Sequence, residues 1–516
     1  MGLTVAPVNA WFLAWVALAP LWYLVVNPTL RPKPSPLLFA LIWGIGYHGI
    51  ALSWITGIHP MTWMGVPWLA SLAIALFCWV FITLWGAASV ALWATGMRII
   101  CKSIPKPYAR VLIGTALWCG IETVLSWGAL FWSSLSYTQS PYNLVIIHLG
   151  QISGPYAVTA AIVAVNGLIA EAFINRQGAK DAKNAEKILA FLASWRFINK
   201  YLITATGLLI CLHLIGCSLY TRPLIQPPAA ALKIGIIQGN IPNKIKLYQE
   251  GLRRALEGYT SGYLTLADQG VDAVLTPEGA LPLFQRNIMG SSLVAAVRSQ
   301  GVVAWIGGFG EKGKSYTNSL LTVTGDGEVF SRYDKVKLVP IGEYVPFEEL
   351  LGGIISRLSP LDEHQVPGSP NQIFNTPFGR AIAGICYESA FPEVFRYQAT
   401  AGGQFILSSS NDAHYSASMP AQHHAQDIMR AIETDRWAVR ATNTGYSAFV
   451  DPHGRTVWIS GHNTYEVHAE TIYRRQTQTL YVRWGDWLTL LLLVSATGVW
   501  LINFLTVQLS RKQGLN

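Results

Sequence analysis

The chain has 516 residues, of which 51% are hydrophobic and only 13% are charged. Soluble proteins carry about 25% charged residues, so this composition excludes a wholly soluble chain and places much of it in lipid. A net charge of +9 could indicate a nucleic-acid-binding protein, but the basic residues fall in particular loops between apolar segments, and this pattern excludes that class.

Seven apolar runs, each about 20 residues long, predict helices that span a membrane. Six of them lie within the first 220 residues, and the seventh lies near the end of the chain. In order, they are Ala10–Val26, Leu37–Trp54, Trp68–Ala94, Val111–Phe131, Tyr156–Ile174, Leu202–Tyr220 and Trp487–Val507. We do not expect the first run to be a cleaved signal peptide, because no positively charged segment precedes it.

Basic residues alternate between the loops that connect these runs. The loops after the first, third and fifth runs contain Lys and Arg, as does the tail after the seventh; Arg98–Arg110 and Arg176–Lys200 are examples. The loops Ile55–Pro67 and Trp132–Pro155 contain neither residue. Because basic loops stay in the cytoplasm, this alternation assigns a side of the membrane to every loop.

The alternation divides the chain into three parts. Residues 1–220 are predicted to form a helical bundle of six spans, with the N-terminus outside. Residues 221–486 are predicted to lie outside the cytoplasm. Residues 487–516 then form a last span and a cytoplasmic tail. The expected fold is therefore a polytopic α-helical membrane bundle plus an extracytoplasmic domain.

Two ionisable residues, His48 and Glu122, lie inside predicted spans. Ionisable groups are unfavourable in lipid and are candidates for function there. For these two residues we expect hydrogen bonds between helices more often than catalysis.

Residues 221–486 alternate between strand and helix patterns. Short apolar runs bounded by polar residues predict strands, and apolar residues at a spacing of 3.6 predict helices. The predicted strands are Leu232–Gly239, Asp272–Thr276, Val302–Gly308, Ala381–Ile385 and Phe405–Leu407, with hairpins Ser319–Thr324/Val329–Arg332 and Val439–Val450/Thr456–Ile459. The predicted helices are Lys246–Asp268, Asn287–Gln300, Phe391–Ala401 and Gln422–Thr434. This alternation predicts an α/β domain.

Cys386 is the only one of the six cysteines that lies in this polar part of the chain. It follows the strand-like run Gly379–Ile385 and precedes a helix-forming segment, so we expect a sharp bend that exposes the sulfur at the edge of a sheet. Backbone N–H groups at such a bend favour a thiolate and can hold an oxyanion. The alternative is a buried structural cysteine.

Two other strand ends carry an acid and an amine. Glu278 follows one predicted strand, and Lys335 follows the second strand of the first hairpin. Glu278 can take a thiol proton, Lys335 can stabilise a thiolate or an oxyanion, and Cys386 can attack a carbonyl. The three therefore form a sensible catalytic set if the strand ends converge. Lys337 is an alternative amine, although the pattern Lys-x-x-Leu-Val-Pro favours Lys335.

Several stretches of the chain match a known family. They are TPEGALP at Thr276–Pro282, YTNSL at Tyr316–Leu320, YDKVKLVPIGEYVP at Tyr333–Pro346, GICYES at Gly384–Ser389, SSNDAHYS at Ser409–Ser416, ALSWITGI at Ala51–Ile58 and SYTQSP at Ser136–Pro141. On these residues the chain resembles the nitrilase (carbon–nitrogen hydrolase) superfamily and, within it, the membrane-embedded apolipoprotein N-acyltransferase family. The resemblance covers nearly the whole chain.

The resemblance implies a nitrilase-like αββα sandwich outside the membrane, standing on a helical bundle. It implies Glu278 as the base, Lys335 at the oxyanion and Cys386 as the nucleophile. It also implies a ping-pong reaction, in which an acyl chain passes from a membrane phospholipid through a Cys thioester to the N-terminal amine of a diacylglyceryl-modified apolipoprotein. We expect no cofactor, no metal ion and no nucleic-acid partner.

Supporting residues also follow from the resemblance. Glu343 is implied to orient the lysine, and Tyr387 and Glu388 to stand beside the nucleophile. The chain departs from the family in two places. Family members commonly have one more helix before the first one here, so either the bundle is shorter or the chain begins downstream of its full start. His414 and Tyr415 stand where aromatic residues are common.

Three histidines and one apolar segment leave alternatives open. His414, His423 and His424 could be metal ligands, but adjacent residues of a helix point to different faces, which favours contact with solvent or a supporting role for the pair. The segment Phe347–Leu361 is either a packed helix or a mobile arm that touches lipid over the site.

Two rival functions use the same residues. A membrane-anchored nitrilase-type amidase would need the same three groups, but seven spans are excessive for anchoring. A transporter or scaffold with an inactive enzyme domain would have no reason to keep the complete Glu–Lys–Cys set.

Overall fold

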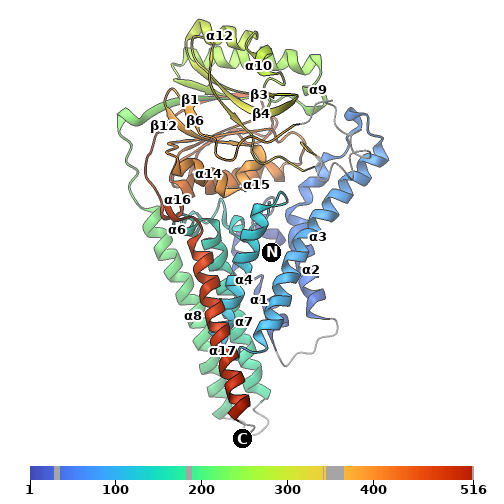
Figure 1. The fold of residues 1–516 in the computed structure, drawn as a ribbon, viewed down its shortest axis with the longest axis vertical. Helices are drawn as coiled ribbons and strands as arrows, with labels where there is room; N and C mark the ends of the chain where they lie inside the picture. Colours follow the sequence, from blue (N-terminus) through green and yellow to red (C-terminus); the bar gives the residue numbers. More distant parts are fainter. Residues whose placement is uncertain (28–34, 182–188, 341, 345–364, 514–516) are drawn as a thin grey trace.

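The computed structural model describes residues 1–27, 35–181, 189–340, 342–344 and 365–513. A bundle of long helices forms one end of the molecule, and sheets covered by helices form the other (Figure 1). This is the expected combination of a membrane bundle and an α/β domain. The apolar segment Phe347–Leu361, expected as a packed helix or a mobile arm, lies outside the described residues.

Seven apolar helices of the described residues, most of them long, build the bundle. They are α1 (Ala19–Val26), α2 (Pro36–Ala51), α3 (Trp68–Cys101), α4 (Pro107–Trp127), α7 (Pro155–Asp181), α8 (Leu189–Tyr220) and α17 (Trp487–Gln513). In the described part of the chain, five helical stretches are long and apolar enough to cross a membrane. They are Trp68–Cys101, Pro107–Trp127, Pro155–Asn175, Lys200–Tyr220 and Trp487–Thr506. These five stretches match the last five predicted spans.

The first two predicted spans contain shorter helices than expected. The run Ala10–Val26 is divided into a 3₁₀ helix, Trp11–Trp15, and the helix α1. The Asn166 side chain on α7 accepts hydrogen bonds from the N–H groups of Leu18 at 2.9 Å and Ala19 at 3.0 Å. These bonds satisfy the first N–H groups of α1, so α1 begins as a separate helix. The second helix, α2, has 16 residues.

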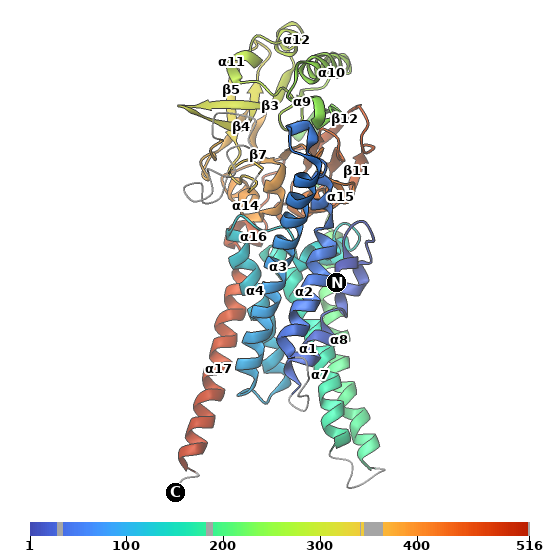
Figure 2. The same ribbon diagram turned by 90° about the vertical axis from the view of Figure 1, so that its right-hand side faces the viewer.

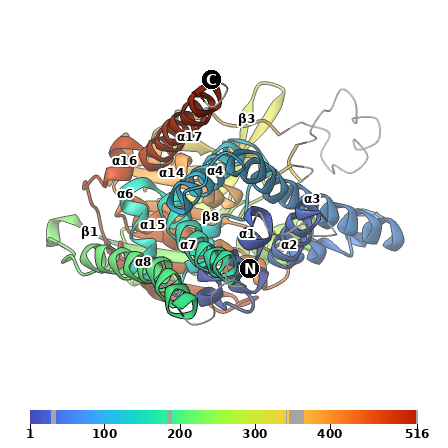
Figure 3. The same cartoon turned by 90° about the horizontal axis from the view of Figure 1, so that it is seen from below.

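Apolar side chains cover the outer surface of the bundle. Leu69, Leu92, Leu214, Val494 and Ile502 are each more than 60% exposed. An exposed apolar surface of this kind is unfavourable in water and is typical of helices that face lipid. Figure 2 shows α3 continuing beyond the other helices alongside the sheets, and Figure 3 shows α8 and α17 on different sides of the bundle.

Inside the bundle, Glu122 on α4 joins neighbouring segments. Its carboxylate accepts hydrogen bonds from Trp118 Nε1 at 3.0 Å, Ser134 Oγ at 2.8 Å, Thr159 Oγ1 at 2.9 Å and the N–H of Leu135 at 3.0 Å. Both carboxylate oxygens are used, as expected for a hydrogen-bond partner between helices.

His48, the other ionisable residue in a predicted span, is buried where α2 meets α3. A Cβ at Gly86 would lie 2.3 Å from the His48 ring, so only glycine allows the two helices to approach this closely. The His48 ring centroid is 4.6 Å from that of Tyr47. His48 therefore packs within the helix interface.

Two six-stranded sheets form the α/β domain. The first has the strand order β12-β1-β2-β3-β4-β5, and the second has the order β11-β10-β9-β8-β7-β6. Strands β1, β2 and β3 run parallel, as do β7, β8 and β9. The strands are β1 (Ala231–Gln238), β2 (Ala273–Leu275), β3 (Val303–Lys312), β4 (Ser315–Val323), β5 (Val329–Asp334), β6 (Phe374–Thr376), β7 (Gly379–Ile385), β8 (Ile406–Ser410), β9 (Ala438–Thr442), β10 (Ala448–Val450), β11 (Thr456–Ile459) and β12 (Glu466–Tyr473).

The two sheets stack face to face, with helices on both outer faces. Ile236 and Trp305 of the first sheet and Ile385 and Leu407 of the second belong to one buried cluster between the sheets. Helices α10 and α12 pack on the first sheet, and α14 and α15 pack on the second. The covering helices are α10 (Gln249–Asp268), α12 (Ser292–Gln300), α14 (Pro392–Thr400) and α15 (Ser418–Thr434). This is the αββα sandwich implied by the resemblance.

Three parts of the strand prediction need correction. Strands β6 and β12 were not expected, and the segment Val439–Val450, expected as one strand, is two antiparallel strands, β9 and β10. Strand β12 pairs with β1 along its whole length, but nearly all of its residues are half-buried, so its sequence lacks the continuous apolar run that marks a buried strand. Strand β6 has only three residues.

The helix α15 fastens the domain to the bundle (Figure 1). Gln422 on α15 accepts a hydrogen bond from Trp132 Nε1 at 2.9 Å and donates one to the carbonyl of Ala51, also at 2.9 Å. Ser140 Oγ donates to the carbonyl of Ala425 on α15 at 2.7 Å. Residues of α14, α15 and the bundle share one buried apolar cluster. The second sheet is therefore held against the membrane part.

We expect Glu122→Ala to destabilise the bundle. The substitution leaves four buried donors without their acceptor, and each such donor costs about 1–3 kcal/mol when it is left unsatisfied. Glu122→Gln keeps one accepting oxygen and should cost less. Thermal unfolding in detergent micelles, followed by tryptophan fluorescence, should place the melting temperature of Glu122→Ala below that of Glu122→Gln. Equal melting temperatures for wild type and Glu122→Ala would contradict this account.

Candidate active site

Cys386 stands at a sharp bend between strand β7 and a short 3₁₀ helix, Cys386–Ala390. Its φ is +51°, in the left-handed region that residues other than glycine rarely adopt. The residue is only 7% exposed. The strand-to-helix turn at the end of a strand in the second sheet is as expected from the sequence. The expected exposure of the sulfur is wrong, because Cys386 is buried.

A buried ammonium group lies between two carboxylates of the first sheet. Lys335 Nζ donates to Glu278 Oε1 at 2.9 Å and to Glu343 Oε1 at 2.7 Å. Asn318 Nδ2 donates to the same two oxygens, at 2.7 Å and 3.2 Å. Lys335 is 1% exposed. The structure thus brings together three of the residues singled out in the sequence, and adds Asn318 on strand β4.

Mutual charge sets the protonation of this group. Burial raises the pKa of Glu278, but the charges of Lys335 and Lys246 outweigh burial and hold that pKa below its ordinary value. Burial lowers the pKa of Lys335, but Glu278 and Glu343 outweigh it and hold that pKa well above its ordinary value. Glu278 is therefore a carboxylate and Lys335 an ammonium at neutral pH.

The charges of Glu278 and Lys335 both affect the pKa of the Cys386 thiol. Burial raises the pKa of Cys386 well above its ordinary value, and the negative charge of Glu278 raises it further. The positive charge of Lys335 and a hydrogen bond from the backbone N–H of Asn411 lower it. Cys386 is therefore a thiol at rest, and a nearby carboxylate is available to take its proton.

Lys337, the alternative amine, points elsewhere. Its Nζ lies 3.4 Å from Glu393 Oε1, 4.6 Å from the centre of the Phe391 ring and 3.5 Å from the carbonyl oxygen of Trp127 in the bundle. Lys335, and not Lys337, is the amine beside Glu278.

Glu388 joins the bend at Cys386 to the segment that carries Lys335. One oxygen of its buried carboxylate accepts from the N–H of Ile385 at 2.7 Å, and the other accepts from the N–H of Val336 at 2.6 Å and of Lys337 at 3.2 Å. Burial raises the pKa of Glu388 to about 7, while these backbone N–H groups favour the ionised form. Glu388 therefore connects the two sheets at the site.

Tyr387 joins the bend to the membrane bundle. Its hydroxyl donates to the carbonyl of Ala129 at 2.6 Å and is 3.1 Å from that of Phe131. Its ring is stacked on Trp132, with centroids 6.1 Å apart. The residue after Cys386 thus contacts the bundle.

Lys246 is a further residue of the site that the sequence did not single out. It is 8% exposed, and its Nζ donates to the backbone carbonyl of Glu278 at 3.0 Å. Burial lowers the pKa of Lys246 to about 8. The lysine lies in a four-residue helix, Asn243–Lys246, within a segment rich in lysine, so no sequence pattern distinguishes it from its neighbours.

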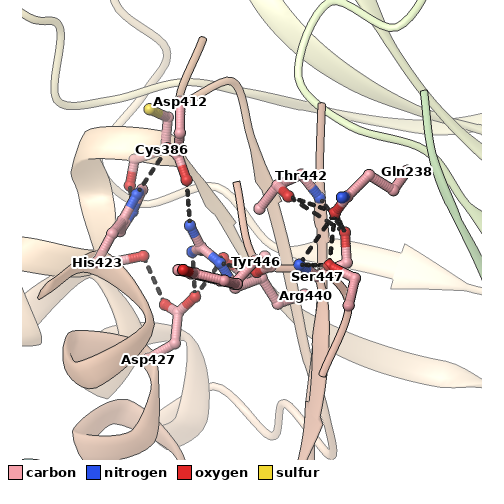
Figure 4. Close-up of polar contacts among 12 residues, drawn as sticks. Gln238, Cys386, Asp412, His423, Asp427, Arg440, Thr442, Tyr446 and Ser447 are labelled. Carbon is pink, nitrogen blue, oxygen red and sulfur yellow. Dashed lines mark hydrogen bonds and ion pairs between the residues drawn. The ribbon is translucent and has the colours of Figure 1, made fainter. Parts of the chain in front are cut away.

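The two adjacent histidines on α15 point in different directions, as expected from their spacing. His423 Nε2 is 2.8 Å from the backbone carbonyl oxygen of Cys386, and its Nδ1 is 3.0 Å from Asp412 Oδ1 (Figure 4). His424 Nε2 is 3.0 Å from Thr456 Oγ1. His423 therefore supports the bend from behind, and His424 does not.

One group of side chains among the described residues has the spacing of a metal site. Ligand atoms of Cys386, Asp412 and His423 lie within 4.8 Å of one another. Both nitrogens of His423 and both oxygens of Asp412 already make hydrogen bonds, the last of them with Arg440 Nη2 at 3.0 Å. A metal ion would have to displace these bonds, so the group fits a hydrogen-bonded network better than a metal centre. His414 instead stacks on Trp63, with ring centroids 6.2 Å apart.

Comparison with known families assigns both halves of the chain. Residues 233–481 match the carbon-nitrogen hydrolase family, and residues 1–168 match the apolipoprotein N-acyltransferase N-terminal domain. The first match covers the sandwich, and the second covers most of the bundle.

Similar proteins match along nearly the whole chain. An apolipoprotein N-acyltransferase from Nostoc sp. is 66% identical over 505 residues, which cover 98% of this chain and 97% of the relative. One from Synechocystis sp. is 48% identical over 519 residues, which cover 97% and 98%. Among solved structures, an amidase from Nesterenkonia sp. covers 50% of this chain and 95% of its own, with 20% identity and a TM-score of 0.37.

The charges around Cys386 predict opposite shifts in thiol reactivity. Lys335→Met removes the charge that lowers the pKa of Cys386, so alkylation should move to higher pH. Glu278→Gln removes a charge that raises this pKa, so alkylation should move to lower pH. The measurement is the rate of Cys386 carboxamidomethylation against pH, read from its peptide by mass spectrometry. Lys337→Met is the control and should leave the profile in place. Shifts of the same sign in the first two variants would contradict the assigned charges.

Proposed function

Because the chain belongs to the apolipoprotein N-acyltransferase family, we propose that it transfers an acyl chain from a membrane phospholipid to the N-terminal amine of an apolipoprotein. It is an acyltransferase with a carbon–nitrogen hydrolase domain. In this proposal the acceptor is the amine of an S-diacylglyceryl-cysteine, and the transfer is the last step of lipoprotein maturation. The amidase alternative is not supported, since the relatives carry the acyltransferase name along nearly the whole chain.

One observation carries the proposal: the bend that holds the nucleophile is bonded directly to the membrane bundle. Tyr387 donates its hydroxyl to Ala129 of the bundle and stacks on Trp132. A buried apolar cluster that includes Trp54 and Phe391 lies at the same junction. A hydrolase of small soluble amides has no need for a thiol at this junction, whereas an enzyme with two lipid substrates needs one there.

The first half-reaction forms the thioester. Glu278 takes the proton of Cys386, and the sulfur attacks the ester carbonyl carbon of the phospholipid. The carbonyl oxygen becomes an oxyanion, which the Lys335 ammonium stabilises. As the tetrahedral intermediate collapses, the C–O bond of the ester breaks, and the leaving alkoxide takes the proton from Glu278 and departs as a lysophospholipid. The acyl group remains on Cys386.

The second half-reaction forms the amide. The neutral amine of the apolipoprotein attacks the thioester carbon, and Glu278 takes a proton from the attacking nitrogen. The C–S bond breaks, the sulfur takes the proton back, and Cys386 returns to a thiol. Glu343 keeps the Lys335 ammonium in place in both halves. Glu388 keeps the bend and the lysine segment together, and neither group exchanges a proton with a substrate.

The same proposal extends to the arrangement in the membrane. The chain is an integral membrane protein, and its relatives and apolar helices indicate the inner membrane. We place six spans in residues 1–220, the catalytic domain in residues 221–486 on the periplasmic side, and a last span with a cytoplasmic tail in residues 487–516. The alternation of basic loops supports this orientation, because basic loops stay in the cytoplasm.

Incubation with phospholipid alone should acylate the protein, because a ping-pong enzyme needs no acceptor for its first half-reaction. Intact-protein mass spectrometry should show an acyl mass shift that neutral hydroxylamine removes, as it removes a thioester. Cys386→Ser and Glu278→Gln should not acquire the shift. Lys335→Ala should lose about 3–4 kcal/mol of oxyanion stabilisation, and Glu343→Ala should acylate slowly because the lysine loses a partner.

Arg286→Ala serves as the control, because Arg286 is an exposed residue paired with Glu311 outside the site. A mass shift that persists in Cys386→Ala, or wild-type turnover without any acyl-enzyme under single-turnover conditions, would refute the thioester mechanism.

Reporter fusions test the orientation separately. A fusion after Lys106 or Gln513 should be active only with a cytoplasmic reporter, and a fusion within the linker Thr221–Pro228 only with a periplasmic one. Activity of a cytoplasmic reporter fused within the linker would contradict both the proposed orientation and the proposed lipoprotein substrates.

A further inference from the structure

His423 is hydrogen-bonded through both ring nitrogens to groups that accept. Its Nε2 contacts the carbonyl oxygen of Cys386 at 2.8 Å, and a carbonyl cannot donate. Its Nδ1 contacts Asp412 Oδ1 at 3.0 Å. Arg440 Nη2 donates to Asp412 Oδ2 at 3.0 Å, and a buried carboxyl that accepts a hydrogen bond from a guanidinium is ionised. Asp412 is then a carboxylate, so His423 must donate from both nitrogens, as an imidazolium.

The charges of the network agree with this protonation (Figure 4). Arg440 donates to Asp412 Oδ2 at 3.0 Å and to Asp427 Oδ2 at 2.5 Å. All four side chains are at most 1% exposed. With a neutral His423, two carboxylates would share one guanidinium and leave a buried negative charge behind the thiol. A positive charge on His423 would neutralise this negative charge. Buried charges are stable only when they are paired with opposite charges.

Every charged or titratable group that contacts this network can be named. Asp427 also accepts from Ser389 Oγ at 2.6 Å, in the 3₁₀ helix that follows Cys386. His424 is the neighbour on the same helix, and burial lowers the pKa of His424 to about 4, so it is neutral. On the other side stands the Cys386 thiol itself. The network therefore approaches Cys386 through His423, through the helix start, and through the Asp412 carboxylate, which lies within 4.8 Å of the sulfur.

We propose that His423 is a positioning residue, which as an imidazolium holds the backbone carbonyl of Cys386 and thereby fixes the bend that presents the nucleophile. A left-handed bend at a residue other than glycine persists only when its surroundings fix it. Because the peptide bond is planar and trans, fixing this carbonyl also fixes the direction of the Tyr387 N–H, which points away from His423 at the start of a helix. An N–H there is suited to an oxyanion.

The turn between β9 and β10 fits closely around the Asp412 carboxylate and helps to fix its position. A Cβ at Gly445 would lie 2.3 Å from Asp412 Oδ2, so the turn between β9 and β10 needs glycine where it meets the carboxylate. Arg440 also donates to the carbonyl of Tyr446 in that turn, at 3.0 Å. The carboxylate that holds His423 is thus itself held from two sides.

Two substitutions of His423 separate the effect of its hydrogen bond to the Cys386 carbonyl from the effect of its charge. In Gln the amide nitrogen can reach the place of Nε2, and in Asn it can reach only the place of Nδ1. Both variants lose the positive charge, but only His423→Gln keeps a donor for the Cys386 carbonyl. We expect single-turnover acylation by phospholipid to be on the order of tenfold or more slower in His423→Asn than in His423→Gln, with KM unchanged in both. Equal rates in the two variants would overturn the positioning role.

The charge is tested by thiol reactivity, which needs no acyl transfer. His423→Gln leaves Asp412 unbalanced and should move the alkylation profile of Cys386 to higher pH. The double variant His423→Gln/Asp412→Asn restores the balance and should move it back. Asp412→Asn alone keeps His423 and should move it to lower pH. An unchanged profile in all three variants would overturn the imidazolium. His424→Gln, buried beside His423 but turned toward Thr456, is the control for folding and should behave as wild type.

The acylation experiment rests on the proposed function, whereas the measurement of Cys386 alkylation against pH does not. Loss of acylation in wild type with the expected alkylation shifts would refute the phospholipid donor and leave the imidazolium standing. Stoichiometric zinc in the purified protein, removed by a chelator together with the alkylation differences, would overturn the proposal, because a zinc-bound His423 is neutral.

Discussion

The site depends on one buried ammonium, that of Lys335. An uncompensated charge in the interior is strongly unfavourable, so Lys335 can be 1% exposed only because Glu278 and Glu343 bind it within hydrogen-bonding distance. Asn318 satisfies the same carboxylate oxygens from a third strand. The buried charge is compensated only when the sheet has formed, because the residues come from different strands. Glu278 follows β2, Asn318 lies on β4 and Lys335 follows β5. In the first sheet β4 and β5 are neighbours, and β3 separates them from β2.

Cys386, the proposed nucleophile, comes from the other sheet, so the site exists only where the two sheets meet. Glu388 makes the connection, since its carboxylate accepts from Ile385 at the end of β7 and from Val336 beyond β5. Tyr387 connects the same bend to Ala129 of the bundle. His423 connects it to α15, the helix on which the domain rests. A residue with a φ of +51° is thus held from three directions, which is how an unfavourable backbone conformation is maintained.

Much of this arrangement could be predicted from the sequence, because it follows from local patterns. The strand–helix alternation indicated the α/β class, and the polar residues after three strands indicated Glu278, Lys335 and Cys386. What the sequence could not supply is contact between distant segments. Asn318 and Lys246 resemble ordinary polar residues of a strand and a short helix until their partners are known. The break before α1 depends on Asn166, nearly 150 residues further along the chain. The edge strands β6 and β12 were missed because β6 has only three residues and β12 lacks a continuous apolar run.

In the proposed reaction a thioester must wait for a lipid-modified amine, and the junction between domain and bundle is suited to protect it. Hydrolysis of the intermediate needs water at the acyl carbon, and a desolvated site limits it. Here the aromatic rings of Trp54, Trp132 and Phe391 share a buried cluster beside the bend. The ring of Tyr415 stands edge-on to that of Trp54, with centroids 4.9 Å apart, and so joins the loop after β8 to the bundle. These apolar surfaces border the bend because the bundle and the sandwich meet there, so in the proposed reaction the same contacts would admit an acyl chain and keep water out.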